Sequence, residues 1–501
     1  MRSMLTRAAI LIFIAIGAKP VFATTFYVSK SVGSDSNTSA QAASKSSPWQ
    51  HLPGMASCSS NCASYTPVAG DKFILMGCDV WVPTDLPVRW PWSGSSASSI
   101  TVTVDTTWYN ITNCPSAWNR PVFDGQNNTS ADIFLDLCTN TNCSYNTFDN
   151  IEMKRGGGND LRYVSCYEQC AHVTTSNMYL HAWHVATDGS CVIEAFYGQN
   201  TNLAETSVID GSDATGASPA GATCYAFYAG LPNIQDNVIH DVANGIVGYS
   251  YDNNPLTFSG NLIYNIKESN AGSHPNAIEI VSGATYYVHD NVIHDAVGES
   301  FMFGNSGETD YVWNNVIFNI MGNAPEGPQV PGQTGMNFFA WNNTVVDTPG
   351  EDCFHWNSGD GGSFIAVTIE NNHCISTAST ASSTWGGISA VQTGNVLMSP
   401  SAASAQGYTA SQTYAYSPPS ATSGTVGKGT NIVSTCTGNL AGLCSDTAYG
   451  SALSAAVSVI APVRTSNVRP SSGAWDVGAY QFSTSQAQAP QPAGVLATNV
   501  K

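Results

Sequence analysis

The chain of 501 residues carries 16 basic and 35 acidic side chains, which gives a formal net charge of −19 at pH 7. Nucleic acids and anionic membranes bind clusters of lysine and arginine, so this balance argues against both as partners. After the leader described next, no stretch reaches the roughly 18 apolar residues that a membrane-spanning helix needs. We therefore expect neither membrane insertion nor a nucleic-acid partner.

Residues 1–23 have the pattern of a secretory signal peptide. Two arginines precede a short apolar run from Ala8 to Ala18, and Val21-Phe22-Ala23 offers small residues at a cleavage position. We expect a mature chain that begins near Thr24, is secreted to the extracellular space or the periplasm, and is a soluble monomer. The leader holds three basic residues and no acid, so its removal makes the net charge −22.

One short phrase recurs through the middle of the chain, an asparagine followed by strand-forming residues, as in Asn237-Val238-Ile239. The repeated asparagines are Asn237, Asn261, Asn291, Asn315, Asn343 and Asn372. Successive copies are separated by about 24 to 30 residues, and a period of roughly 20 to 50 residues is typical of solenoids. The interval is longest between Asn261 and Asn291.

Each period contains three short segments in which β-branched and aromatic residues alternate with small or polar ones, and helical spacing is absent. The sequence therefore predicts an all-β fold, a parallel β-helix of about ten coils with three strands in each coil. Stacked at one turn, the repeated asparagines would bond to their neighbours and to the backbone, which is a structural role.

The terminal regions depart from the repeat. Solenoids need atypical units that cover the exposed edges of the first and last coils. We expect an N-terminal cap and the first coils in 24–120, the β-helix proper in 121–400, and C-terminal coils and a cap in 401–482. Residues 483–501, rich in Gln, Ala and Pro, are typical of a flexible tail.

The 14 cysteines form an even set, which in an exported protein favours disulfides over free thiols or zinc ligands. Cys191 and Cys224 lie in similar sequence contexts, so we expect them on adjacent coils. Four other pairs are close enough in sequence for local bridges: Cys58/Cys62, Cys138/Cys143, Cys166/Cys170 and Cys436/Cys444. The connectivity stays open at this point, and metal binding by the Cys-x3-Cys spacings is the alternative.

Both ends of the mature chain carry phrases that are similar to a known group of proteins. The phrases are Tyr27-Val28-Ser29, Gly33-Ser34-Asp35, Pro48-Trp49, Ala69-Gly70-Asp71 and Trp475-Asp476-Val477-Gly478-Ala479-Tyr480. Together with the asparagine repeat, they resemble right-handed parallel β-helix proteins of the pectate lyase-like superfamily. The resemblance implies a polysaccharide partner and a substrate groove along one sheet. It fixes no activity, because lyases, glycoside hydrolases, epimerases and adhesins share this architecture.

The segment before Glu279 is the strongest candidate for chemistry. Alternation around Glu279 puts its isoleucine neighbours inside the coil and the glutamate outside. The coil is lengthened just before it, and solenoids place binding loops at such insertions. Lys267 and His274 lie in this insertion, so Lys267, His274 and Glu279 form a candidate catalytic acid/base set. The alternative is a solvated loop beside a surface glutamate.

The same reasoning suggests further contacts with a substrate. Asn276 lies beside Glu279, and alternation exposes Glu194 and His355 on equivalent strands. Trp356 follows His355 and could stack on a sugar ring. We expect Glu194, His355, Trp356 and Asn276 to bind substrate.

Nearby carboxylates add two options. Glu308, Asp310 and Asp352 could hold calcium, which binds carboxylate oxygens. Alternatively, paired carboxylates about 5 to 10 Å apart could hydrolyse a glycosidic bond.

The predicted function is that of a secreted, polysaccharide-active enzyme that cleaves glycosidic bonds by β-elimination or by hydrolysis. Elimination from a heavily charged polymer is disfavoured, because residues 121–400 contain only four cations, Lys154, Arg155, Arg162 and Lys267. The alternative is a non-catalytic, glycan-binding or adhesin-type surface protein. Convergence of the outward residues of the third strand with carboxylates or a cation in one cleft would favour the enzyme, whereas a flat face of Asn, Ser and Thr would favour adhesion.

Overall fold

The computed structural model describes most of the chain after the leader. The described residues are 23–130, 132–138, 141–158, 160–166, 170–185, 191–196, 199, 201–216, 224–267, 275–322, 325–327, 332–346, 352–356, 362–377, 384–385, 388–412, 414–447 and 466–482. Within them, no helix has the length and apolar character needed to cross a membrane. His274 lies outside the described residues.

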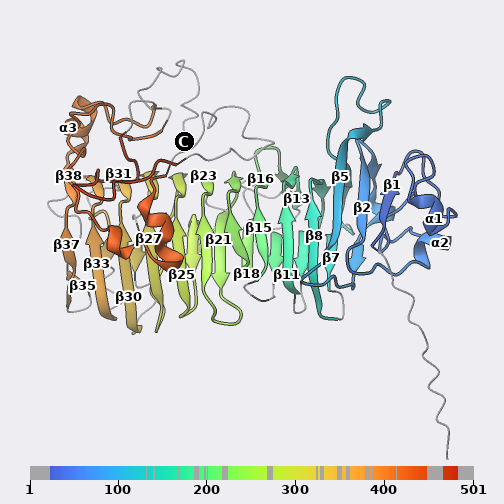
Figure 1. Cartoon of the computed structure of the whole chain (residues 1–501), viewed down its shortest axis with the longest axis horizontal. Helices are drawn as coiled ribbons and strands as arrows, with labels where there is room; N and C mark the ends of the chain where they lie inside the picture. Colours follow the sequence, from blue (N-terminus) through green and yellow to red (C-terminus); the bar gives the residue numbers. More distant parts are fainter. Residues whose placement is uncertain are drawn as a thin grey trace, which may run out of the picture.

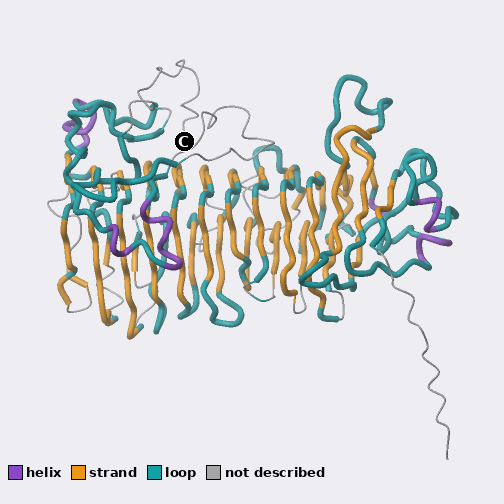
Figure 2. The backbone as a smooth tube through the Cα atoms, viewed as in Figure 1, coloured by secondary structure: helices purple, strands orange, loops and turns teal. Residues whose placement is uncertain are grey.

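The strands stack into three long parallel sheets that run the length of the molecule (Figures 1 and 2). Sheet A has 13 strands: β1 (Thr25–Val28), β2 (Lys72–Gly77), β5 (Ile100–Tyr109), β8 (Cys143–Asp149), β11 (Cys170–Ser176), β15 (Leu203–Glu205), β19 (Asn233–Gln235), β22 (Leu256–Ser259), β25 (Thr285–His289), β27 (Thr309–Trp313), β30 (Thr334–Trp341), β33 (Ser363–Glu370) and β37 (Val391–Thr393).

Sheet C has 12 strands: β3 (Val80–Trp81), β6 (Val122–Asn128), β9 (Glu152–Gly156), β12 (Tyr179–His181), β16 (Val208–Asp210), β20 (Val238–His240), β23 (Leu262–Ile266), β26 (Val292–Ala296), β28 (Val316–Ile320), β31 (Thr344–Val346), β34 (His373–Ile375) and β38 (Val396–Met398). Sheet B has seven: β4 (Val88–Trp90), β7 (Ile133–Leu137), β10 (Arg162–Cys166), β14 (Val192–Phe196), β18 (Tyr225–Gly230), β21 (Asn244–Tyr249) and β24 (Ile278–Ile280). Each coil passes through sheets A, C and B in turn, so the predicted three-stranded parallel β-helix is confirmed.

The remaining elements are short. They are the pairs β13 (His184–Val185) with β17 (Thr215–Gly216), β29 (Glu326–Gly327) with β32 (His355–Trp356) and β35 (Thr384–Trp385) with β36 (Ile388–Ser389), the helices α1 (Ser39–Ala42), α2 (Ser60–Ala63) and α3 (Pro400–Ala405), and the 3-10 turns η1 (Pro83–Asp85), η2 (Val433–Thr435) and η3 (Gly438–Cys444). The pair β29–β32 continues the line of sheet B, to which it is joined by bridges through Met302.

Identical positions stack in the core. In sheet C, Ile209, Ile239, Ile263 and Ile293 pair in register, and each is at most 1% exposed. Full burial of such a side chain contributes about 1.5–3 kcal/mol. The second residue after each asparagine therefore belongs to the inward column of sheet C, whereas the first belongs to its outward column.

The repeated asparagines line the turn between sheets A and C. The amide of Asn291 donates to Phe258 O and to Asn315 Oδ1, both at 2.9 Å, while its oxygen accepts from Asn261 N and Nδ2. The preceding Asp290 adopts a left-handed conformation with φ of 56°, which aspartate and asparagine tolerate better than other residues. Equivalent bonds link the ladder from Asn237 to Asn395, which confirms its structural role.

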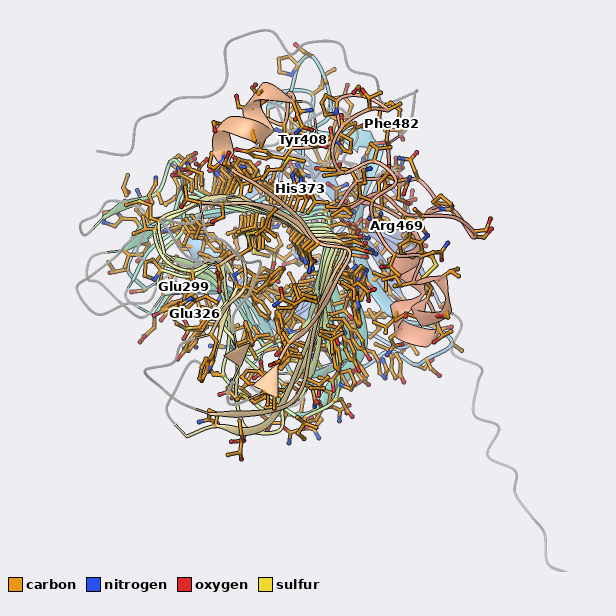
Figure 3. The ribbon with its side chains drawn as sticks, turned by 90° about the vertical axis from the view of Figure 1, so that its left-hand side faces the viewer. Glu299, Glu326, His373, Tyr408, Arg469 and Phe482 are labelled. Carbon is orange, nitrogen blue, oxygen red and sulfur yellow. A yellow bond between two sulfur atoms is a disulfide. The ribbon has the colours of Figure 1, made fainter. Side chains whose placement is uncertain are left out.

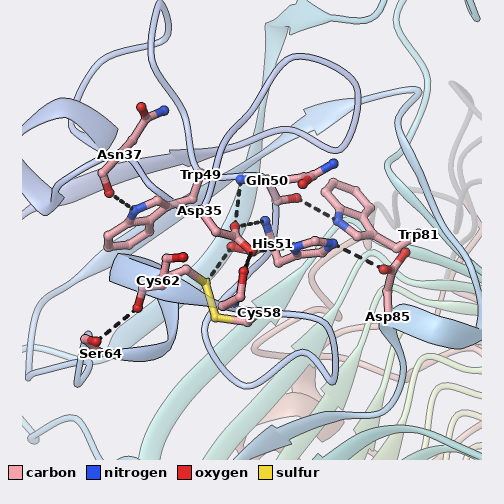
Figure 4. Close-up of a disulfide and its surroundings, with 12 residues drawn as sticks. Asp35, Asn37, Trp49, Gln50, His51, Cys58, Cys62, Ser64, Trp81 and Asp85 are labelled. Atoms are coloured by element: carbon pink, nitrogen blue, oxygen red, sulfur yellow. Dashed lines mark hydrogen bonds and ion pairs between the residues drawn. A yellow bond between two sulfur atoms is a disulfide. The ribbon is translucent and has the colours of Figure 1, made fainter.

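A polar cluster fastens the N-terminal cap beside the Cys58–Cys62 disulfide (Figure 4). The His51 ring lies between two carboxylates, with Nδ1 2.7 Å from Asp35 and Nε2 3.2 Å from Asp85. Burial lowers the pKa of His51, but the hydrogen bonds to both carboxylates outweigh it and raise the pKa above its ordinary value. These buried charges are therefore paired, as an interior requires.

All 14 cysteines form disulfides, and none is free. The five pairs expected from the sequence are confirmed, including Cys191–Cys224 between adjacent strands of sheet B. The other two bridges are Cys78–Cys114 and Cys353–Cys374.

The described parts of the segment from 400 to 482 fold back over the coils that precede them (Figure 1). Tyr408 and Tyr480 pack on the outward aliphatic column of sheet C, including Val292 and Val316. Trp475 packs with the outward tryptophans of sheet A, Trp313 and Trp341. The C-terminal segment therefore covers the outer faces of sheets A and C in the later coils.

Candidate functional site

The outward side chains of sheet B form one column along the coils. Its members, paired rung by rung, are Asp136, Ser165, Ala195, Tyr228, Val247, Glu279, Met302, Glu326 and His355. Figure 3 shows Glu299 and Glu326 on the side of the coil away from Arg469 and Phe482 of the C-terminal segment. Two of the predicted residues, Glu279 and His355, therefore lie on one face with a glutamate between them.

A buried asparagine holds Glu279 in place. The amide of Asn276 donates to Glu279 Oε2 at 3.0 Å, and its oxygen accepts from the backbone N–H of Glu299 at 2.9 Å. Asn276 is fully buried, and its nitrogen also lies 3.5 Å from the sulfur of Met302. The prediction that Asn276 binds substrate does not match its buried position, from which it orients the carboxylate of Glu279.

Glu326 is the second carboxylate of the column. Met302 pairs with Glu279 on one side and with Glu326 on the other. Neighbouring rungs of a sheet are about 4.8 Å apart, so Glu279 and Glu326 are about 10 Å apart at the backbone. Side chains on backbones at this spacing can bring their carboxyl groups to the roughly 6.5–9.5 Å of inverting glycosidases, which leaves room for a water molecule.

Tyrosines lie beside these acids on the preceding coils. Tyr228 is 42% exposed, and the ring centroids of Tyr225 and Tyr228 are 4.9 Å apart. Burial raises the pKa of Tyr225, with smaller contributions from Tyr228 and from the charge of Glu279, which places that carboxylate close by. Tyr249 and the 43% exposed Tyr251 follow on the next coil. Amphipathic rings of this kind suit the faces and hydroxyls of sugars.

Lys267 lies at the end of the sheet C strand β23. Its ammonium forms an ion pair with the carboxylate of Asp241, and the lysine side chain is 40% exposed. His355 and Trp356 form β32, where Trp356 packs against the hydrophobic core while remaining partly exposed. The catalytic roles predicted for Lys267 and His274 and the binding role of His355 and Trp356 stay predictions.

The expectation that Glu194 faces outward is wrong. Glu194 pairs with Val164 and Phe227 in the inward column of sheet B and is 1% exposed. Thr175 Oγ1 donates to its Oε2 at 3.0 Å, and Oε1 has no hydrogen-bond partner. Burial raises the pKa of Glu194 to about 7. A side chain inside the coil does not contact a polysaccharide on the outer face.

The carboxylates predicted to bind calcium do not gather around one point. Asp310 points into the coil between Tyr286 and Phe338, and both Asp310 and Glu308 are at most 1% exposed. Burial raises the pKa of both, and the two carboxyl groups hydrogen-bond to each other. Together with Asp352 they do not form a set of three ligand atoms within 4.8 Å of one another in the described residues. Calcium binding stays a prediction.

Asp210, His240 and Asp241 do form such a set. The His240 ring lies between the carboxylates, 2.8 Å from Asp241 and 3.5 Å from Asp210, and it stacks on Tyr264 at 4.7 Å. Calcium takes six to eight oxygen ligands, whereas this group offers two carboxylates, one imidazole and the adjacent cation of Lys267. Its arrangement is a chain of polar contacts in which the Asp241 carboxylate lies between the His240 ring and the ammonium of Lys267.

The sequence prediction missed Glu326, although a signal for it exists. The interval from Asn315 to Glu326 is the same as the interval from Asn291 to Met302. Counting from the asparagine ladder therefore puts Glu326 on the rung after Met302. The two-residue strand β29 is too short to show alternation by itself.

No model of a protein family matches the sequence, and neither does any curated protein. Solved structures match the fold at low identity. GH136 lacto-N-biosidase from Eubacterium ramulus is 12% identical with a TM-score of 0.40, over 75% of this chain and 68% of that one. Pectate lyase Pel9A is 14% identical with a TM-score of 0.41, over 92% and 98%. A rhamnogalacturonan lyase is 11% identical with a TM-score of 0.38, over 74% and 87%. These similarities concern the fold alone.

Proposed function

We propose that this protein is a secreted enzyme that cleaves glycosidic bonds of a polysaccharide on the outer face of sheet B. The observation that carries the proposal is the position of Glu279 and Glu326 in one outward column, two rungs apart. The polysaccharide substrate itself is suggested by the sequence resemblance and by the tyrosines of the preceding coils.

The chemistry that fits this pair is hydrolysis. One carboxyl group protonates the glycosidic oxygen as the bond to the anomeric carbon breaks, and the other carboxylate takes a proton from the attacking water. The hydroxyl of that water joins the anomeric carbon, so both protons and both sugar fragments are accounted for. Asn276 keeps the Glu279 carboxylate in a fixed orientation, which reaction between aligned groups requires.

Elimination is the second candidate, with Lys267 as the base that takes a proton next to a uronate carboxylate. Its support is that Lys267 is one of only four cations in residues 121–400. Its weakness is the ion pair with Asp241, which already occupies the side-chain nitrogen that would have to take the proton. Hydrolysis needs no such cation.

The test is incubation of the mature protein with a panel of neutral and acidic polysaccharides, with calcium and with a chelator. Hydrolysis releases reducing ends without ultraviolet-absorbing products, whereas elimination gives unsaturated, absorbing ends. Glu279→Gln and Glu326→Gln should each lower the rate of hydrolysis at least about 100-fold. Glu205→Gln, on the outward face of sheet A, is the matched control and should keep full activity.

Three results would contradict the proposal. Full activity of both glutamine variants would remove the site, and unsaturated products that disappear in Lys267→Met would replace hydrolysis with elimination. Absence of cleavage on the whole panel, combined with retention of the protein on a glycan column, would establish the non-catalytic binding protein instead.

A further inference from the structure

A cavity of about 510 Å³ opens at the N-terminal end of sheet A, on the outer faces of β1, β2 and β5. These strands lie at the opposite end of the helix from the C-terminal segment (Figure 1). The cavity belongs to a different sheet from Glu279 and Glu326. Its volume falls within the range of roughly 300–1000 Å³ that is typical of ligand sites.

A bulge in β5 forms the rim. Leu75 pairs with Val104, but Gly77 pairs with Tyr109, so the residues between Val104 and Tyr109 have no counterparts in β2. The looped-out Trp108 packs edge-on against Tyr27, with ring centroids 5.2 Å apart and an interplanar angle of 85°. The extra residues therefore build a wall that a regular strand would lack.

The floor is one row of outward side chains across four strands. Tyr27 pairs with Ile74, Ile74 with Thr103, and Thr103 lies on the rung of Asp149, to which its hydroxyl donates at 2.6 Å. The row therefore runs from an aromatic ring through an aliphatic side chain to a hydroxyl and a carboxylate. Such a floor can meet the apolar face of a sugar ring at one end and sugar hydroxyls at the other.

The charges around the cavity are partly satisfied within the protein. Lys45 forms an ion pair with Asp105 at 2.5 Å, and its hydrogen bond is the main reason that the pKa of Asp105 falls to about 2. Asp149 accepts hydrogen bonds from Thr103, Ser176 and Asn177.

Lys72 is the other cation of the cavity, and it is exposed beside Thr25 on the row next to the floor. The chain as a whole contains 16 basic residues, so a lysine at this position is not explained by a generally basic surface. With Asp105 and Asp149 bonded to neighbouring groups, the ammonium of Lys72 is available to a ligand anion.

We propose that this cavity is a second glycan-binding site, separate from the cleavage site, which takes a sugar residue that carries a carboxylate. Tyr27, whose ring has the ammonium of Lys45 5.7 Å from its centroid, provides the aromatic contact. Thr103 and Asp149 meet hydroxyls, and Lys72 pairs with the carboxylate of a uronate. This site goes beyond the proposed cleavage, because it requires binding alone and stands whether or not sheet B is catalytic.

Calorimetric titration tests it, with oligogalacturonides as acidic probes and cello-oligosaccharides as neutral ones. Measurements use the full mature chain carrying Glu279→Gln, so that probes stay intact. Tyr27→Ala should weaken oligogalacturonide binding about 2- to 12-fold, the range expected for loss of one aromatic contact. Lys72→Met should weaken binding of the acidic probe about 5- to 10-fold and leave the neutral probe unchanged. Lys428→Met, an exposed lysine of the C-terminal segment, is the matched control.

Tyr228→Ala separates the two sites, because it alters sheet B and should leave binding at the cavity unchanged. Circular dichroism checks that Tyr27→Ala remains folded, and Lys72→Met tests the site independently at an exposed position. Oligogalacturonide affinity that is unaltered in both Tyr27→Ala and Lys72→Met overturns the proposal. Equal loss of acidic and neutral probes in Lys72→Met overturns the assignment of a uronate.

Discussion

Asn276 and Glu279 are joined by a hydrogen bond of 3.0 Å from the side-chain amide to Oε2, and Asn276 is fully buried beneath the carboxylate. This contact positions an outward glutamate through a residue that a substrate does not reach. Asn276 therefore has a positioning role, whereas the glutamates are the groups proposed to transfer protons.

Replacing Asn276 by alanine should therefore lower kcat about 10- to 100-fold and change KM little, since a misplaced catalytic group costs rate. The backbone N–H of Glu299 also loses an acceptor, which should cost about 1–3 kcal/mol of stability. Steady-state kinetics on the best substrate of the panel, with thermal unfolding in parallel, measures both. An unaltered kcat in a folded variant would show that Glu279 needs no such support.

The asparagine ladder should be sensitive to a single break. Asn291→Ala removes two donors and one doubly used acceptor in a fully buried turn. Phe258 O then loses its side-chain donor and the backbone N–H of Asn261 loses its acceptor, whereas Asn315 Oδ1 still accepts from the backbone N–H of residue 291. We expect a loss of about 3 kcal/mol in the free energy of unfolding. Denaturant titration measures this loss, and the rate of cleavage by the folded fraction should stay constant. A change below about 0.5 kcal/mol would mean that water replaces the ladder without cost.

The buried pair Glu308 and Asp310 should make stability depend on pH. Burial raises the pKa of Glu308 from 4.5 to about 7, although hydrogen bonds from Asp310 and Asn305 oppose the shift. The folded protein then binds more protons than the unfolded chain between these values, so this stabilising contribution is present below about pH 4.5 and is lost as pH rises through 7.

Glu308→Gln removes the titrating group. The melting temperature of the variant, relative to that of the native protein, should therefore increase as pH rises from about 4.5 to 8. Thermal scans at a series of pH values measure it, and taking the difference cancels groups common to both proteins. A difference that is constant across this range would contradict the raised pKa of Glu308.

Arg469 anchors the C-terminal segment. Its guanidinium is 2% exposed and donates to Asn314 Oδ1 at 3.1 Å and to the backbone oxygen of Gly478 at 3.0 Å. Arg469→Ala should destabilise the protein by about 3 kcal/mol, because charged hydrogen bonds in a buried site are lost. Arg89→Ala is the control, since the side chain of Arg89 is 65% exposed. Equal melting temperatures for the two variants would contradict the anchoring role.

The fold could be predicted because the sequence pattern that produces it is repeated along the chain. An asparagine ladder and an inward isoleucine column recur together in successive coils from Asn237 to Asn315, so each copy strengthens the same inference. Glu279 could be assigned to the outer face because apolar Ile278 and Ile280 on either side of it must both point inward.

The orientation of Glu194 could not be settled in this way. Strand β14 has apolar residues at every position apart from the glutamate, and all five side chains are buried. Alternation within the strand is then uninformative, and the pairing with Val164 decides which way Glu194 points. Lys267 was assigned to chemistry because of its charge, but its partner Asp241 belongs to the previous coil and is distant in sequence.

The fold-back of residues 400–482 has a consequence for the order of assembly. The aliphatic column of sheet C and the tryptophan column of sheet A are synthesised before the segment that covers them. Arg469, which donates a hydrogen bond to Asn314, lies 155 residues further along the chain. A simple solenoid can gain or lose coils from its ends one at a time. Here the later coils pack against the C-terminal segment. They should therefore complete their folding together in one late step, and they should resist fraying as a unit.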